Sequence, residues 1–298
     1  MIEGVYSARG YALLKFEPHL HTLHSDGADS VAAMFEACQA AGYDAVALTD
    51  HNTLSGLPEA IEAAARLGLV VVPGVEVTTF RGHALALGVQ RVPEWRDLEA
   101  RGMDALAAEV RAQDGVLSVC HPAALGSPYC SGCAWEWPIA PSAVDMWEVF
   151  NDPGPEVPLA LWRKLLQAGG HVAPVAAGDV HSVAEAARPR QTTYLYARER
   201  SAAGVLEALR HLRVTASLSS PLEFWLEEEA SGAPALVGSR VAEARWNARL
   251  AGTGEVESVS LADGARCVYA ARRDAQGGLE AVSAPIWIET SQYADASV

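Results

Sequence analysis

Residues 16–27 read FEPHLHTLHSDG, in which an apolar start is followed by three histidines and an aspartate. We expect residues 16–22 to form a strand that ends in polar side chains. Because side chains alternate between the two faces of a strand, His19 and His21 would share one face and point at one ion. A lone H-x-H pair is more often a coincidence than a pair of metal ligands. The interpretation therefore depends on whether other ligand-type residues join it.

Further groups of histidines and carboxylates recur along the chain. They are Asp50-His51, Glu76 with His83, His121, and Asp179-x-His181. Each group lies at or just past the carboxyl end of an expected strand, and in a barrel of parallel strands those ends meet at one rim. Imidazole and carboxylate together suit zinc, manganese or iron. Chance would not place such motifs at successive strand ends, so the pattern predicts a metal-dependent hydrolase.

Strand-like and helix-like segments alternate through the first 220 residues. The expected strands are 16–22, 44–49, 69–75, 84–89, 116–120, 144–150, 171–177 and 192–196, and the expected helices are 30–42, 55–68, 94–113, 159–168 and 202–212. This order predicts parallel strands with helical crossovers, either closed into a barrel or left as an open sheet. Residues 221–298 contain no histidine and no long amphipathic helix. We therefore expect residues 1–220 to form the metal-binding barrel and residues 221–298 a small β-rich domain or cap.

Composition limits the classes of partner. A net charge of −15 argues against a surface that coats nucleic acid, so a nucleotide or short single strand is the most we expect of that class. No apolar run approaches the roughly 20 residues of a membrane span, and the N-terminus lacks the apolar core of a secretory signal. We expect a cytoplasmic protein with no membrane partner. Cys130 and Cys133 stand without a second pair or a nearby histidine, so we expect reduced thiols rather than a separate zinc site.

The complete set of motifs resembles the PHP (polymerase and histidinol phosphatase) family of metal-dependent hydrolases. The matching segments are His19-Leu20-His21-Thr22 with Ser25-Asp26-Gly27, Thr49-Asp50-His51-Asn52, Gly74-Val75-Glu76 with His83, Cys120-His121-Pro122, and Gly178-Asp179-Val180-His181-Ser182. Within the family, residues 144–151 (VDMWEVFN) look most like the carbaryl-hydrolase-type branch. Pro18 and Cys120 depart from the family's usual residues, but neither change removes a ligand.

The resemblance implies a fold, a cofactor and a ligand set. The fold would be a distorted (β/α)7 TIM-like barrel of the α/β class, holding two or three divalent ions (zinc, manganese or iron). The ligand sets carried over by motif are His19, His21, Glu76 and Asp179 for one ion, Glu76, His83 and His121 for a second, and Asp26, His51 and His181 for a third. Asp50 would orient a ligand without binding. Asp179, His181 and Glu76 would be catalytic, around a hydroxide that bridges two metals.

Three functions remain open at this stage. The first is hydrolysis of a small phosphate ester or nucleotide, with Arg188 and Arg190 gripping the phosphate and His24 near the substrate. These arginines belong to a set of six between residues 188 and 213 that would form an anion-binding rim beside the last metal motif, or else a solvated face. The second is hydrolysis of a carboxylic or carbamic ester in an apolar pocket built from Trp135, Trp137 and Trp147. The third is a non-catalytic module in which metals only stabilise the fold. The oligomeric state is not predicted.

Overall fold

The computed structural model describes residues 5–289 except residues 131, 139, 152, 153, 189, 190, 262 and 263. Its helices are η1 (Ser7–Arg9), α1 (Val31–Ala40), α2 (Leu57–Leu67), α3 (Leu98–Arg101), α4 (Met103–Arg111), α5 (Glu156–Gln167), α6 (Val183–Ala186) and α7 (Ala202–Arg210). The strands of the first 220 residues are β1 (Ala12–Glu17), β2 (Ala45–Leu48), β3 (Val70–Thr79), β4 (Gly82–Leu87), β5 (Val116–Val119), β6 (Met146–Phe150), β7 (Ala173–Ala176), β8 (Thr192–Ala197) and β9 (Val214–Ser217). The later strands are β10 (Glu223–Glu228), β11 (Pro234–Leu236), β12 (Arg240–Ala242), β13 (Trp246–Ala251), β14 (Glu255–Ser260), β15 (Arg266–Arg273), β16 (Leu279–Ser283) and β17 (Ile286–Glu289).

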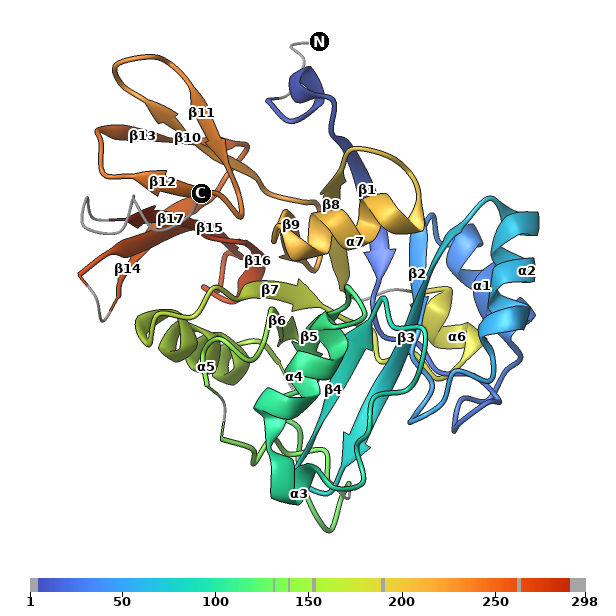
Figure 1. Ribbon diagram of the computed structural model, residues 1–298. Coiled ribbons are helices and arrows are strands. Elements are labelled where there is room, and N and C mark those ends of the chain that lie inside the picture. The colour runs from blue at the N-terminus through green and yellow to red at the C-terminus, as the bar shows by residue number, and fades with distance from the viewer. Residues whose placement is uncertain are drawn as a thin grey trace.

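A large mixed sheet organises the molecule. Its central order is β9-β8-β1-β2-β3-β4-β5-β6-β7, and β16 continues it from β9 into the C-terminal strands (Figure 1). The pairs β1–β2, β2–β3, β5–β6 and β6–β7 are parallel, as expected for strands joined by helical crossovers. The pairs β3–β4, β4–β5, β1–β8 and β8–β9 are antiparallel. The protein thus has a mixed α/β fold with a β-rich C-terminal region.

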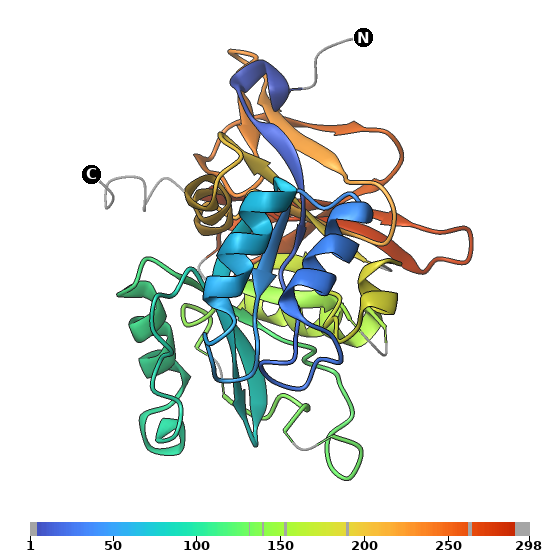
Figure 2. The ribbon, with the colours of Figure 1, turned by 90° about the vertical axis from the view of Figure 1, so that its right-hand side faces the viewer.

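The closed (β/α)7 barrel is not confirmed by this topology. A tight turn at residues 80–81 joins β3 directly to β4, so these two strands are antiparallel where parallel strands were expected. The sheet nevertheless curls, because the backbone N–H of Ala176 on β7 donates to Thr193 Oγ1 on β8 over 2.9 Å. Helices α1 and α2 cover its outer side (Figure 2).

Helix boundaries differ from the expected ones for local reasons. The expected helix 94–113 is two helices, because Gly102 lies between them with φ 77° and ψ 172°. The cap of α1 is Ser30, whose side chain accepts from the N–H of Ala33. Helix α2 begins after Gly56, two residues later than expected. Gly68 ends α2 in the left-handed conformation that favours glycine.

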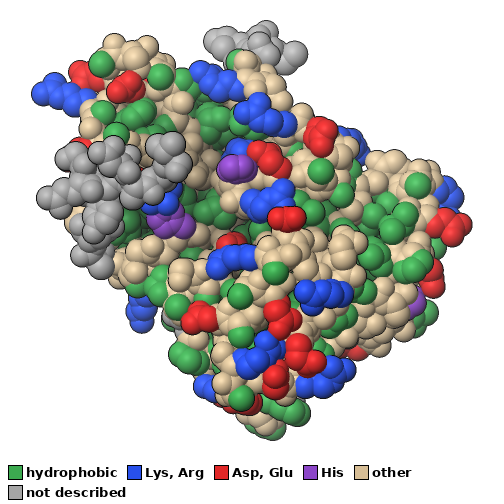
Figure 3. Space-filling model, in the orientation of Figure 1, with side chains coloured by type: hydrophobic (Ala, Val, Ile, Leu, Met, Phe, Trp, Pro, Cys, Tyr) green, Lys and Arg blue, Asp and Glu red, His purple; other side chains and the backbone are tan. Residues whose placement is uncertain are grey.

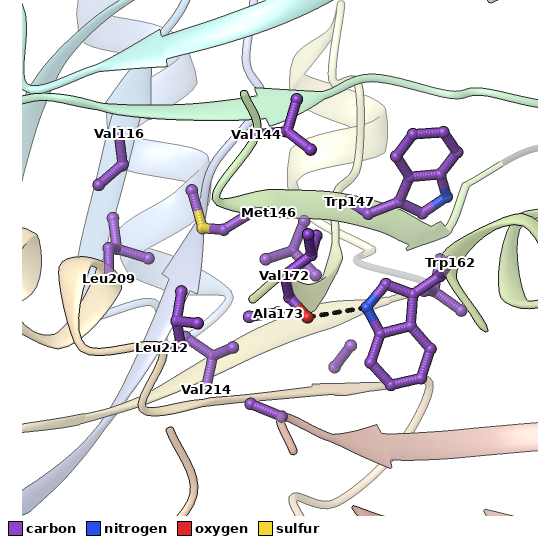
Figure 4. Packing of buried hydrophobic residues seen from close by; sticks show 14 of the residues in the cluster. Val116, Val144, Met146, Trp147, Trp162, Val172, Ala173, Leu209, Leu212 and Val214 are labelled. Carbon is purple, nitrogen blue, oxygen red and sulfur yellow. Dashed lines mark hydrogen bonds between the residues drawn. The ribbon is translucent and has the colours of Figure 1, made fainter. Parts of the chain in front are cut away.

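The apolar interior fills one end of the curled sheet. Leu209 and Leu212 pack near Val116, Met146 and Val214, which are the first residues of β5, β6 and β9 (Figure 4). Nearby, the indole N–H of Trp162 on α5 donates to the carbonyl of Val172 over 2.9 Å. The end of α7 therefore packs under the amino ends of these strands. Their carboxyl ends are left for polar side chains.

Two features of the surface complete the fold. Acidic and basic side chains are interspersed on the face shown in Figure 3, so the negative charge forms no single patch there. No helix in the described part of the chain combines the length and apolarity that crossing a membrane requires.

Candidate metal centre

Five segments bring histidines and carboxylates together at one end of the central sheet, which holds the carboxyl ends of β1, β3 and β5 and the amino end of β4. His19 and His21 follow β1, and Glu76 lies within β3; all three are completely buried. His83 is on β4 and His121 follows β5, each 5% exposed. Buried polar groups carry a large desolvation penalty unless they are paired or bind a metal. Such a group of fully buried ligand atoms requires a partner.

The first cluster consists of His19, His21, Glu76 and Asp179. His19 Nε2 lies 3.4 Å from Glu76 Oε2 and 3.2 Å from Asp179 Oδ1, and His21 Nε2 lies 3.3 and 3.2 Å from the same two oxygens. An ion held tetrahedrally at about 2.1 Å has ligand atoms about 3.4 Å apart. The four atoms are therefore spaced as ligands of one ion are spaced.

These atoms also lack ordinary hydrogen bonds. Within the described residues, His19 Nε2, His21 Nε2, His83 Nε2 and Glu76 Oε2 have no hydrogen-bond partner although all four atoms are buried. Native proteins rarely leave such atoms unsatisfied, and a bound ion is one of the accepted reasons. The donor set of imidazole and carboxylate fits zinc, manganese or iron.

The outer nitrogens of three histidines are held by partners that fix the ring. His121 Nδ1 lies 3.3 Å from the carbonyl oxygen of Cys133, and His181 Nδ1 lies 2.8 Å from that of Asp179. A carbonyl only accepts, so each Nδ1 carries the proton and each Nε2 is free to bind. His19 Nδ1 contacts the buried carboxylate of Glu148 at 2.9 Å in the same way. This is the arrangement by which proteins orient metal-ligating histidines.

Glu76 is the common neighbour of the second group. Its Oε1 lies 3.0 Å from His83 Nδ1 and 3.2 Å from His121 Nε2, and its Oε2 lies 2.8 Å from His51 Nδ1. One carboxylate thus faces the first cluster with one oxygen and the second group with the other. A carboxylate in this position has one oxygen available to each group.

A third group lies at the more exposed mouth of the site. Asp26 places Oδ2 3.3 Å from His51 Nε2 and Oδ1 3.4 Å from His181 Nε2, and Asp26 is 55% exposed. His21 Nδ1 also approaches Asp26 Oδ1, at 3.7 Å. His21 therefore faces two groups at once, which the motif-based ligand sets do not include.

Electrostatics couple the first cluster tightly. Burial opposes ionisation of Glu76, but His19, His121 and His51 hold the pKa of its carboxyl well below the usual range. Burial likewise opposes a charged His19, yet the carboxylates of Asp179, Glu76 and Glu148 raise its pKa well above the ordinary value. The carboxylates and histidines of this cluster thus stabilise each other's charged forms.

Two buried carboxylates were missed from the sequence. Glu148, on β6, is fully buried and accepts from the backbone N–H of His121 over 2.6 Å as well as contacting His19. Glu17, at the end of β1, accepts from the N–H of Gly178 over 2.9 Å, and burial raises the pKa of Glu17 to about 7. The available signal was an acid inside an otherwise apolar strand such as Met146–Phe150. Cys120 adds a buried thiol near Glu76 and His121.

Other predicted site residues lie outside the clusters. Asp50 accepts from the N–H and hydroxyl of Thr22 and from the hydroxyl of Ser25, so it holds the loop that carries Asp26. His24 turns toward α2, with Nδ1 2.8 Å from Ser55 Oγ. Arg188 is exposed after α6. Arg190 lies outside the described residues, and the substrate contacts of His24, Arg188 and Arg190 stay predictions.

Among the described arginines of the predicted rim, the four from Arg198 to Arg213 have partners away from the metal centre. Arg198 contacts Tyr11, Arg200 pairs with Asp44, and Arg210 donates to the carbonyl of Asp114. Arg213 pairs with Glu207. Arg198 and Arg213 share Tyr11, whereas Arg200 and Arg210 have partners on other segments.

The loop after β5 also differs from expectation. Cys130 and Cys133 are joined in a disulfide, so the prediction of two reduced thiols is wrong. The indole N–H of Trp135 donates to the carbonyl of Trp137, whose own indole N–H donates to Thr79 Oγ1. These two tryptophans therefore pack the loop against the β3–β4 turn. Trp147 is buried, and its N–H donates to the carbonyl of Pro158.

Backbone geometry at the site is unusual. His121, Asp179 and Asn52 have positive φ angles of 25°, 48° and 53°. Such angles are uncommon for residues with a Cβ and concentrate at functional sites. Gly27 is required because an added Cβ would lie 2.6 Å from the backbone of His21. The H-x-H segment is thus held in place by close backbone contact.

Comparison with known proteins agrees with this geometry. Residues 17–132 match the family model described as PHP domain, a range that includes His19 to His121 but not Asp179. A phosphoribosyl 1,2-cyclic phosphate 1,2-diphosphodiesterase of Eggerthella lenta is 40% identical over 78 residues, 24% of this chain and 30% of that protein. A 3',5'-nucleoside bisphosphate phosphatase of Chromobacterium violaceum is 35% identical over 102 residues, 29% of this chain and 36% of that protein. The chain thus spans about a third of these curated relatives.

A solved structure extends the likeness to the fold. It is a two-domain protein of Bacteroides vulgatus containing a predicted PHP-like metal-dependent phosphoesterase, and it matches with a TM-score of 0.55 and 18% identity. The match covers 88% of this chain and 96% of that one. At this identity the likeness concerns the fold alone. Residues 17–132 are therefore similar to the PHP domain, and the two curated relatives are a phosphodiesterase and a phosphatase by name.

Proposed function

We propose that this protein is a divalent-metal-dependent phosphoesterase acting on a small phosphate ester or nucleotide. The observation that carries the proposal is the position of the buried Glu76 carboxylate, which has His19 and His21 at one oxygen and His83 and His121 at the other. Two or three ions of zinc, manganese or iron would be held by the ligand sets described above. The named activities of the two curated relatives support the phosphate-ester substrate class.

The protein's own residues would prepare the reaction. Divalent ions at such a site supply Lewis acidity and lower the pKa of water toward about 7. Asp179 is the most exposed carboxylate of the first cluster, at 29%. Burial opposes its charge, but His19 and His21 hold the pKa of Asp179 below its usual range, so it is ionised at neutral pH. We assign Asp179 the acceptance of a proton from water as the water oxygen bonds to phosphorus; the bond to the leaving oxygen breaks, and that oxygen takes a proton from solvent. Glu148 and the Cys133 carbonyl would hold the His19 and His121 rings still.

A cleft next to the centre would receive the rest of the substrate. It encloses about 630 Å³ and is bordered by Asn52, the residue after His51, and by Arg91, Trp95 and Arg96 on the segment before α3. Glu94 and Glu109 also line the cleft and balance the charge of the two arginines, so the Trp95 ring is the feature that suits a planar part of the substrate. Replacing Trp95 with alanine should raise KM severalfold and leave kcat nearly unchanged. Replacing Trp246, on the distant strand β13, should change neither.

The test is a parallel hydrolysis assay on zinc- and manganese-loaded protein. The panel would pair aryl phosphates, nucleoside phosphates and a cyclic phosphate with aryl esters and carbamates. Asp179→Asn is the inactive control, and Asp104→Asn, at an exposed position on α4, is the matched control. Phosphate release that only Asp179→Asn abolishes would support the proposal. Absence of phosphate release from the whole panel would refute it.

The same panel addresses the other two functions. Cleavage of esters or carbamates alone would place the protein with the carbaryl-hydrolase type, with Trp135 and Trp137 as candidate apolar contacts near the β3–β4 turn. If the metal-loaded protein hydrolyses none of the substrates, it would be a non-catalytic module.

We also propose a division of the chain into two units and a description of the central sheet. Residues 1–220 would be the catalytic unit and residues 221–298 an accessory unit joined to it through β16 and β9. The curled central sheet would be an incompletely closed version of the distorted (β/α)7 barrel, supported by the Ala176–Thr193 contact between β7 and β8.

A further inference from the structure

A second hollow lies far from the metal centre. It encloses about 440 Å³ between the N-terminal segment, the end of β8, the end of α7 and the C-terminal strands. Figure 3 shows the surface hollowed in this upper region, with Lys and Arg side chains bordering it. The residues that characterise it are Arg9, Tyr11, Arg198, Arg213, Pro234 and Leu236.

Strand geometry separates this hollow from the site already described. Tyr11 precedes the first residue of β1, and His19 follows its last residue. Eight residues of extended chain span about 26 Å at roughly 3.3 Å per residue. Arg198 follows β8, which is antiparallel to β1, and Arg213 precedes β9, so both lie at this same end of the sheet. A ligand here cannot touch the metal ligands.

The arginines are held in place. Arg213 is 8% exposed, its Nε donates to the carbonyl of Tyr196 over 3.1 Å, and its Nη2 pairs with Glu207. Arg198 Nη2 donates to the Tyr11 hydroxyl over 2.9 Å. Both guanidinium groups also lie over the Tyr11 ring, at 4.6 and 4.9 Å from its centre. The Tyr11 ring thus contacts two guanidinium groups, and each of them retains further N–H donors.

The charged side chains that line the hollow are basic, whereas the molecule as a whole is acidic. The protein carries −15 overall with only 22 basic residues, yet three arginines and His211 border this hollow. None of the described residues lining it is acidic. Glu207 on α7 pairs with Arg213 and lies 3.6 Å from His211, which leaves Arg9 and Arg198 without an acidic ion-pair partner among the described residues. Like charges gathered this way destabilise one another unless an anion is present. The local excess of positive charge therefore indicates an anionic ligand.

We propose that this hollow is a binding site for a small molecule that carries a dianionic phosphate group. Guanidinium groups bind phosphate through paired N–H donors, which favours phosphate over a single point of negative charge. Pro234 and Leu236 form an apolar wall that suits the uncharged part of such a molecule. The volume is within the range of small-molecule sites. The site does not depend on the activity of the metal centre.

The test is calorimetric titration of the full chain, both zinc-loaded and chelator-treated, with orthophosphate, with a nucleoside 5'-monophosphate and with the uncharged nucleoside. Binding of a phosphate compound should persist after chelation, because the site holds no metal ligand. Arg198→Met and, separately, Arg9→Met should weaken it by about tenfold or more, the value of a charge-assisted contact. Arg245→Met is the matched control at an exposed position and should change the affinity by less than about twofold.

Each outcome either identifies the type of ligand that the hollow binds or overturns the proposal. Tighter binding of the monophosphate than of orthophosphate would assign the site to a phosphate ester, and equal binding would assign it to free phosphate. Binding that disappears on chelation would mean that the metal centre had taken the ligand, and it would overturn the proposal. The absence of binding to chelator-treated protein, or unchanged affinity in both arginine variants, would overturn it as well.

Discussion

Replacing Glu148 with glutamine tests how the metal centre is held together. Glu148 Oε1 lies 2.9 Å from His19 Nδ1, while Oε2 accepts from the His121 N–H at 2.6 Å and from Asn151 Nδ2 at 2.7 Å. Glutamine has the same shape but one oxygen and one amino group. The two donors at Oε2 require the oxygen there, so the amino group must face His19. That forces the His19 proton onto Nε2, the atom that faces Glu76 and Asp179.

The expected magnitude follows from this change of tautomer. Loss of an outer partner of a metal-ligating histidine lowers metal affinity about 10- to 100-fold. This corresponds to about 1.4 to 2.7 kcal/mol of binding free energy. The fold should survive, because every backbone donor keeps an acceptor.

The assay is competition for zinc against a chromophoric chelator, with circular dichroism to verify folding. Glu36→Gln, an exposed glutamate paired with Arg66 between α1 and α2, is the matched control and should bind zinc as the unmodified protein does. If Glu148→Gln binds zinc within about twofold of the unmodified protein, the orientation of His19 by Glu148 is not needed for binding and the reasoning is refuted.

Three further predictions concern stability and backbone fit. Zinc at a hundredfold excess over Kd should add about 2.7 kcal/mol to the free energy of unfolding, measured by urea denaturation. His121→Ala should reduce this gain in stability. If the variant gains as much from zinc as the unmodified protein does, the assignment of His121 as a ligand is wrong. Gly27→Ala should destabilise the protein by about 1–3 kcal/mol and lower its zinc content, because its Cβ would lie 2.6 Å from the His21 backbone. An unchanged melting temperature would show that the loop moves without cost and would contradict this prediction. The pKa of Glu17 is raised to about 7 from 4.5, so its protonated form favours folding fully below pH 4.5 and this contribution is lost as pH rises to 7. Chelator-treated Glu17→Gln should therefore lose less stability than the unmodified protein between those pH values, and parallel urea-denaturation profiles would contradict the assignment.

Local patterns in the sequence carry much of the fold. Apolar runs predicted β2, β5 and β6 close to their observed bounds, because buried strands are short and continuous. Gly68 marked the end of α2 because only glycine adopts the left-handed cap without strain. The β3–β4 hairpin was missed because its turn at Phe80-Arg81 carries no Asn-Gly type signal.

The candidate ligands were identifiable for a different reason. His19, His21, Glu76 and His121 are chemically conspicuous, and they recur at strand ends. Glu148 was missed because it sits in a strand that otherwise reads as core. The relation of Glu148 to His19 joins positions 129 residues apart, which no local pattern reports.

By itself, the sequence determined the alternation of elements, the ligand residue types and the absence of long apolar spans. These depend on neighbouring residues along the chain, where side-chain periodicity and turn chemistry act. Only the tertiary structure decided that Glu76 faces two groups of histidines, that Glu148 holds His19, and that Arg198 and Arg213 meet over Tyr11 at the opposite end of the sheet. These relations depend on strand order and direction, and long-range packing sets both.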